Sequence, residues 1–139
     1  MMIMTLMSTD TGITARDLTE YWQRERLIAE MQYERDSIAG LVESPRLGWD
    51  GSARGNAPSN PTERKIRRMQ ILDAKIARYA AMQDRVDAVV DGIDDPTAHC
   101  IIAYRYICGL RWLDVADKSH VTEDAAKKIA QRWIRKNLE

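Results

Sequence analysis

The chain has 139 residues, of which 45% are hydrophobic, and its 21 basic and 21 acidic residues give a formal net charge of zero. This length and hydrophobic share suffice for one helical domain, with or without a small appendage, and the zero charge argues against a general polyanion binder. The charge is uneven, because residues 1–60 carry −3, residues 61–95 are balanced and residues 96–139 carry +3. Nucleic-acid contacts are therefore expected in the last third.

The N-terminal run MMIMTLM is hydrophobic but too short to span a membrane. It also lacks the charged start and the cleavage site of a signal peptide. We interpret it as a frayed leader and expect a cytoplasmic protein with no membrane partner.

A first helix is predicted from about Thr14 to Val42, where Ser44-Pro45 follows. Its apolar residues recur at helical spacing: Tyr21, Ile28, Met31, Ile38, Leu41 and Val42. Residues 44–61 then contain three Gly, three Pro and three Ser, a composition that no packed helix tolerates. We predict a long flexible loop there, whose Arg46, Trp49 and Arg54 contact either a partner or nothing.

A second helix is predicted to start at Pro61, because Asn60 can cap it and Glu63 can complete a capping box. Two heptad positions are apolar, or nearly so, for about four heptads. One holds Met69, Ile76, Gln83 and Val90, and the other Leu72, Tyr79, Val86 and Ile93. This seam needs a partner, which is either the first helix folded back antiparallel or a second copy in a homodimer.

A third helix is predicted from Pro96 to Cys108, with Asp95 as its cap and Gly109 at its end. Cys100 and Cys108 lie about 12 Å apart along such a helix, too far for a disulfide. We expect both to be small core residues of a reduced protein. Two cysteines and two histidines without metal-ligand spacing predict no metal site, and no cofactor is expected.

The last thirty residues, Gly109 to Leu138, hold two short helical patterns around a polar turn, Lys118 to Val121, with Thr122 capping the second. Two short helices separated by a turn in this way are typical of a helix-turn-helix motif. On a helical wheel, one face of the second helix has Ala126, Ile129, Ala130 and Trp133, and the other has Asp124, Lys128, Gln131 and Arg135, flanked by Lys127 and Arg132. This polar face could enter a DNA major groove, although a solvated amphipathic helix has the same pattern. Trp112 and Trp133 are expected in the core.

This stretch resembles region four of sigma-70-type factors. The resemblance rests on Gly109-Leu110, Trp112, Val115-Ala116, Thr122, Lys127, Arg132 and Ile134 and covers about thirty residues. In the turn, this chain has Ser119 and His120 where the family usually has an apolar residue followed by glycine. The family's DNA contacts near the start of the recognition helix carry over to Glu123, Asp124, Lys127 and Lys128.

The whole layout, with Arg105-Tyr106-Ile107-Cys108-Gly109-Leu110-Arg111-Trp112 before the motif, is similar to small phage and prophage regulators of the ArpU and RinA type. That resemblance implies a regulator of late-gene transcription, which binds double-stranded DNA and could also contact RNA polymerase. It implies an all-α fold, with a long antiparallel helical hairpin over residues 1–94 and a helix-turn-helix domain over residues 95–139. The DNA-binding residues are then Glu123, Asp124, Lys127, Lys128, Gln131, Arg132 and Arg135.

Enzyme function is not expected, because the sequence has no Gly-rich phosphate loop and no Ser-His or Cys-His arrangement at usable spacing. Two alternatives to the regulator remain. A small-terminase-like DNA-packaging protein also joins a helix-turn-helix to a helical hairpin, and a ring of eight or more subunits would favour it. A coiled-coil adaptor would bind protein instead of nucleic acid.

Overall fold

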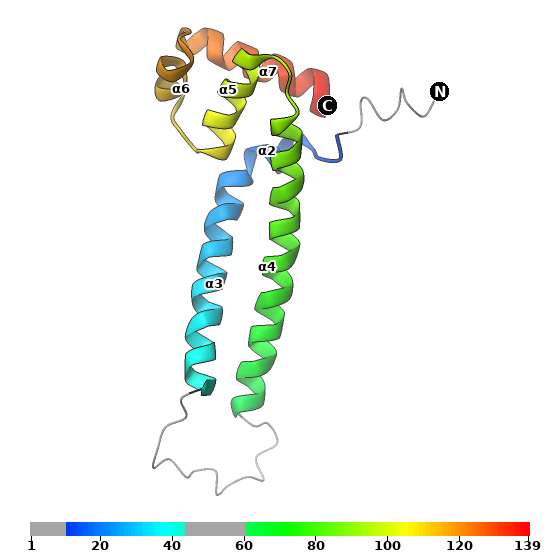
Figure 1. The fold of residues 1–139 in the computed structure, drawn as a ribbon, viewed down its shortest axis with the longest axis vertical. Helices are drawn as coiled ribbons and strands as arrows, with labels where there is room; N and C mark the ends of the chain where they lie inside the picture. The colour runs from blue at the N-terminus through cyan, green and yellow to red at the C-terminus, as the bar shows by residue number, and fades with distance from the viewer. Residues whose placement is uncertain (1–10, 44–60) are drawn as a thin grey trace, which may run out of the picture. The chain divides into compact units, whose positions relative to one another are not determined.

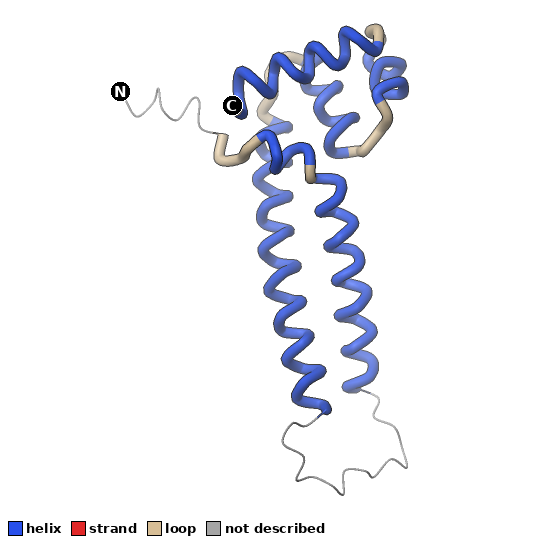
Figure 2. The backbone as a smooth tube through the Cα atoms, turned by 180° about the vertical axis from the view of Figure 1, so that it is seen from behind, coloured by secondary structure: helices blue, strands red, loops and turns tan. Residues whose placement is uncertain are grey.

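The computed structural model describes residues 11–43 and 61–139, and its regular structure in these ranges is entirely helical, with no strand (Figures 1 and 2). The all-α class is therefore confirmed. The leader at residues 1–7, the loop up to Asn60 and the loop residues Arg46, Trp49 and Arg54 lie outside the described residues. The chain divides into two compact units, a terminal unit of residues 1–25 and 81–139 and a middle unit of residues 26–80.

The first helix among the described residues of the terminal unit is short. It is α2 (Ala15–Thr19), and Thr14 opens it with a capping box, in which its hydroxyl accepts from Asp17 N at 3.1 Å and its own N–H donates to the Asp17 carboxylate at 2.9 Å. α3 (Tyr21–Glu43) follows after a break at Glu20, where φ is −94° and ψ is 4°. The expectation of one helix from Thr14 to Val42 was therefore wrong. At the break, the Arg24 guanidinium donates to the Asp17 carbonyl at 3.2 Å, which compensates for the interrupted backbone ladder.

The predicted seam is confirmed, because none of its seven residues in α4 (Pro61–Asp91) is exposed, and neither is Ile93 just beyond the helix. Leu72 is buried in the middle unit, and Gln83, Val86 and Val90 are buried in the terminal unit. On α3, Leu41 was expected to face inward but is exposed. The physical reason is its position about 100° around the helix from Val42, outside the inward stripe.

Within the middle unit, α3 and α4 lie side by side in both views of the backbone (Figures 1 and 2). Two ion pairs join them: Arg35 Nε lies 2.9 Å from Asp73 Oδ1, and Arg68 Nε lies 2.8 Å from Glu34 Oε2. The hydrogen bond from Arg68 holds the pKa of the Glu34 carboxyl below its usual value. Because both pairs are exposed to solvent, they set the register of the two helices more than they stabilise them.

The third predicted helix is present but changes its pitch. α5 (Pro96–Ile102) begins with the Asp95 side chain accepting from Ala98 N at 3.1 Å, as the Asp-Pro step predicted. It continues into the π-helical turn η2 (Ala103–Ile107), which Cys108 N closes by donating to Ala103 O at 3.0 Å. Cys100 and Cys108 are both free and exposed, so the expectation that they are core residues was wrong. The buried residues of this segment are instead Ala98, Ile101 and Ile102.

The last two helices, α6 (Trp112–Ser119) and α7 (Glu123–Leu138), pack against α5 and against each other. The core of these helices also includes residues from the segment around α2 and from the end of α4. Its buried members are Ile13, Leu18, Tyr21, Val86, Val90, Ile101, Ile102, Val115, Ala116, Ala126, Ala130 and Ile134. The end of α4 and the segment around α2 thus share one core with the last three helices.

Candidate nucleic-acid interface

The turn between α6 and α7 is tight. α6 runs through Lys118 and Ser119, so the turn is shorter than the four residues expected from the sequence. His120 has the left-handed conformation, with φ of 59°, and Val121 N donates to Ala116 O at 3.1 Å. This is the geometry that usually employs glycine at a helix end. His120 thus occupies a left-handed conformation that favours glycine.

The start of α7 is fixed by the predicted cap. The Thr122 hydroxyl accepts from Ala125 N at 3.1 Å, and Thr122 itself is extended, with φ of −76° and ψ of 161°. Glu123 and Asp124 fall in the first turn, where a carboxylate interacts favourably with the helix dipole. The two acids at the expected interface therefore have a local structural role as well.

The inner face of α7 is buried as the helical wheel predicted. Ala126, Ala130 and Ile134 are buried, and Ile129 and Trp133 are partly buried against the same core. Two alanines at this spacing allow α7 to approach its neighbours closely, because they add little volume between the helices. The orientation of α7 is set by this packing and not by its charged residues.

The outer face of α7 carries the polar residues that the sequence assigned to DNA. Those exposed to solvent are Glu123, Asp124, Lys128, Gln131, Arg132 and Arg135, and Lys127 is partly exposed. Lys127 Nζ lies 3.4 Å from Glu123 Oε2, so one predicted cation is paired within its own helix. Four donor-bearing side chains, Lys128, Gln131, Arg132 and Arg135, thus face solvent along α7 from its second turn onward.

An aromatic cluster connects η2 to the start of α6. The Arg105 guanidinium lies 4.8 Å from the centroid of the Trp112 ring and donates to the Leu110 carbonyl at 2.9 Å. Tyr106 meets Trp112 edge to face, with centroids 6.4 Å apart. Burial raises the pKa of the Tyr106 phenol. Trp112 and Trp133 both pack on the core but are only partly buried, so the expectation of core residues was correct in part.

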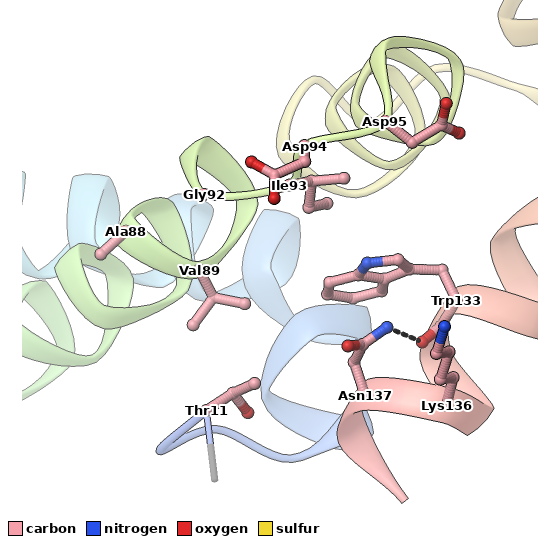
Figure 3. A pocket seen from close by; sticks show the side chains of 10 residues that line it. All are labelled: Thr11, Ala88, Val89, Gly92, Ile93, Asp94, Asp95, Trp133, Lys136 and Asn137. Carbon is pink, nitrogen blue, oxygen red and sulfur yellow. Dashed lines mark hydrogen bonds between the residues drawn. The ribbon is translucent and has the colours of Figure 1, made fainter. Parts of the chain in front are cut away.

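A pocket of about 420 Å³ lies elsewhere in the terminal unit (Figure 3). The end of α4, the connection to α5 and the last turns of α7 line it, together with Thr11. Asp94 and Asp95 lie toward one end and Lys136 and Trp133 toward the other (Figure 3). Asp95 already caps α5, and Asn137 donates to the Trp133 carbonyl at 2.9 Å. Two polar side chains of this pocket, those of Asp95 and Asn137, therefore already bond to the local backbone.

Two further searches concern only residues 11–43 and 61–139. No three His, Cys, Asp or Glu side chains in these ranges gather closely enough to hold a metal ion. None of the helices described there is both long and apolar enough to cross a membrane.

In comparisons with known proteins, no protein family, curated protein or solved structure matches this chain.

Proposed function

We propose that this chain is a cytoplasmic, sequence-specific DNA-binding protein that regulates transcription, of the phage or prophage type. In this proposal, α5, α6 and α7 form a helix-turn-helix unit like sigma-70 region four, and α7 is the recognition helix. α3 and α4 form the antiparallel hairpin that precedes this unit. The ligand is double-stranded DNA.

The two-sided character of α7 is the observation that carries this proposal. Its alanine-rich inner face is buried, while Lys128, Gln131 and Arg135 project into solvent at spacings of three and four residues. A major groove admits one α-helix, and Lys, Arg and Gln are the side chains that donate to base edges and phosphates there. The tight turn at His120 and the cap at Thr122 support the same reading, because a recognition helix needs a fixed start.

The modest charge of the C-terminal third bears on the partners. With +3 over residues 96–139, one copy of this unit should bind DNA weakly and with strong salt dependence. Tight binding then requires additional contacts with DNA or with a protein already bound to it. We propose that a second copy of the chain or RNA polymerase provides these contacts.

Selection of bound duplexes from a random pool, with the full chain as bait, tests this function. A recurring sequence in the bound fraction is the expected result, because base-edge contacts discriminate among sequences by roughly 1–3 kcal/mol each. A bound fraction without any enriched sequence would contradict specific reading. Absence of binding to any duplex at low salt would contradict DNA binding altogether.

One observation favours the adaptor as a second candidate. α3 exposes large apolar side chains, among which Leu27 is 46% and Tyr33 77% exposed. Exposed apolar side chains on a helix can serve a protein partner. Under that reading, the chain binds no duplex at low salt.

A further inference from the structure

The middle unit carries a stripe of positive charge along one flank of α4. At about 100° per residue, five cations fall within about 100° of arc. They form what we call the basic stripe: Arg64, Arg67, Arg68, Lys75 and Arg78. The two acids of this segment, Glu63 and Asp73, lie outside that arc. The net charge of this segment gives no sign of the stripe, because the equal numbers of acidic and basic residues in 61–95 conceal their separation around the helix.

All five cations of the basic stripe are exposed to solvent, and so is Ile71 between them, at 42%. The Arg68 cation is partly neutralised by its 2.8 Å ion pair with Glu34 of α3, and the same carboxylate interacts electrostatically with Lys75. The guanidinium of Arg78 lies 5.7 Å from the centroid of the neighbouring Tyr79 ring, a contact that keeps its charge. From Arg64 to Arg78, the stripe is about 21 Å long at about 1.5 Å per residue.

We propose that the basic stripe is a second DNA-contacting surface, which binds the phosphate backbone without reading sequence. The inference rests on the proposed function, since the ligand is the same duplex. A duplex carries one negative charge per about 1.7 Å of its axis with both strands counted, so a segment of about 21 Å contains about twelve phosphates, of which those on one side face the stripe. Phosphate contacts of this kind add affinity and salt dependence but no specificity.

Charge complementarity favours a nucleic acid over a second copy of the chain as the occupant. A two-fold pairing that placed stripe against stripe would bring like charges together, and such contacts are repulsive. A phosphate backbone is complementary along the whole length. Phosphate contacts of the stripe would also add to the weak DNA affinity expected of the C-terminal third, which carries a net charge of only +3.

The test compares four variants of the full chain in titrations of a labelled random-sequence duplex at about 50 and 200 mM salt. Arg67→Gln with Arg78→Gln removes two cations from the stripe, and Arg67→Lys with Arg78→Lys keeps both charges. Gln70→Glu with Ala77→Glu changes the net charge by the same amount as the first variant, but at exposed positions outside the stripe. Arg135→Ala alters α7 alone, at an exposed residue expected to contact phosphate, so its effect should appear on any duplex. Circular dichroism verifies that each variant is folded.

Removal of two phosphate contacts should reduce the slope of log K against log salt by about two. Between the two salt concentrations, the wild type should then lose about tenfold more affinity than the Gln variant. The Lys variant should behave as the wild type does, and the Glu variant should keep the wild-type slope. These three results together support the proposal.

Three results would overturn it: wild-type affinity and slope in the Gln variant, an equal loss in the Glu variant, or a fall in sedimenting mass that shows the stripe to join two copies. The Arg135→Ala variant separates this failure from failure of the proposed function. If it weakens binding while the Gln variant does not, α7 binds DNA and the stripe does not. If the reverse holds, the stripe stands and the role of α7 fails. A wild type that binds no duplex overturns both.

Discussion

Arg24 and Gln83 form a buried polar pair in the terminal unit, where Arg24 Nη1 donates to Gln83 Oε1 at 2.7 Å and the two residues are 6% and 4% exposed. Gln83 Nε2 donates in turn to the Tyr21 carbonyl at 3.0 Å and to the Glu25 carboxylate at 2.8 Å. Gln83 thus fills an otherwise apolar heptad position with a side chain whose amide is fully used. A polar group at such a position favours one register, because any shift leaves it without partners.

Replacement of Gln83 by Leu should lower the free energy of unfolding by about 1–3 kcal/mol, since the buried Arg24 guanidinium would lose one of its acceptors and keep the Asp17 carbonyl and the Glu20 carboxylate. Urea denaturation followed by circular dichroism measures the change. Replacement of Arg24 by Leu in the same chain should restore part of the loss, because the incompletely hydrogen-bonded guanidinium is then removed. If Gln83→Leu is as stable as the wild type, the hydrogen bond has no net stabilising role.

Gly109 is the second long-range determinant of the terminal unit. Its φ is +72°, and a Cβ added there would overlap the indole of Trp22. Gly109→Ala should therefore destabilise the protein by about 2 kcal/mol or more, from backbone strain and from displacement of Trp22. Gly40, within α3, has open space around it, so Gly40→Ala should stabilise by about 0.5–1 kcal/mol. Thermal midpoints that move in the same direction for both variants would contradict this account.

Local signals were enough to predict much of this fold. The Asp95-Pro96 step predicted the start of α5, and the heptads predicted which side of α4 is buried. The alternation of small and charged residues in α7 predicted its two faces, because a helix of known period fixes which residues share a side. The candidate site was thus predictable as a set of exposed residues, although not as a binding site.

The features that the sequence did not predict depend on contacts between distant residues. The contact of Trp22 with Gly109 leaves no periodic trace, and neither does the break at Glu20, where Arg24 bonds to a carbonyl seven residues earlier. The π-helical turn from Ala103 also lacks a glycine or proline within it. These elements are decided by packing in the terminal unit, which overrides local preference.

The phenol of Tyr21 should make stability sensitive to alkaline pH. Burial, and then a hydrogen bond to Asp87, raise its pKa well above the usual value of about 10. The folded state therefore favours the neutral phenol, and this contribution is complete below about pH 10 and is lost as the pH rises further, when the unfolded chain ionises first. Thermal midpoints between about pH 9 and 11 should fall less steeply for Tyr21→Phe than for the wild type. Tyr33→Phe is the matched control, because Tyr33 is 77% exposed; an equal effect of both variants would contradict the role of Tyr21.

Ser119, in the last turn of α6, has a buried hydroxyl without a hydrogen-bond partner. Ser119→Ala should therefore raise the free energy of unfolding by about 1 kcal/mol, since it removes a desolvated polar group and improves the helix propensity. Urea denaturation measures the change. Ser37→Ala in α3 is the control, because the Ser37 hydroxyl already donates to the Tyr33 carbonyl at 2.9 Å and its removal does not relieve an unpaired buried group. If Ser119→Ala is destabilising, then its hydroxyl has a partner in solution.

Two residues of α7 should respond differently when changed to alanine. Lys128 lies in the second turn of α7, near the end that enters a major groove in helix-turn-helix proteins, and Arg135 lies two turns further on. If Lys128 contacts a base, Lys128→Ala should weaken binding to the selected sequence by about 1–3 kcal/mol and relax the preference at one position. Arg135→Ala should weaken all duplexes alike and reduce the salt slope by about one, because a contact with phosphate carries no sequence information.

Titration of the selected duplex and of a scrambled one, each at two salt concentrations, separates these outcomes. Arg16→Ala serves as the control, because its guanidinium is exposed, pairs with Glu20 within the segment around α2 and lies outside α7. It should leave the ratio of the two affinities unchanged. The recognition role of α7 requires that Lys128→Ala lower this ratio and that Arg135→Ala preserve it, since only a base-edge contact distinguishes one duplex from the other. Wild-type binding in both α7 variants would contradict the DNA-binding role of α7 and leave protein binding as the better explanation for the exposed side chains of α3.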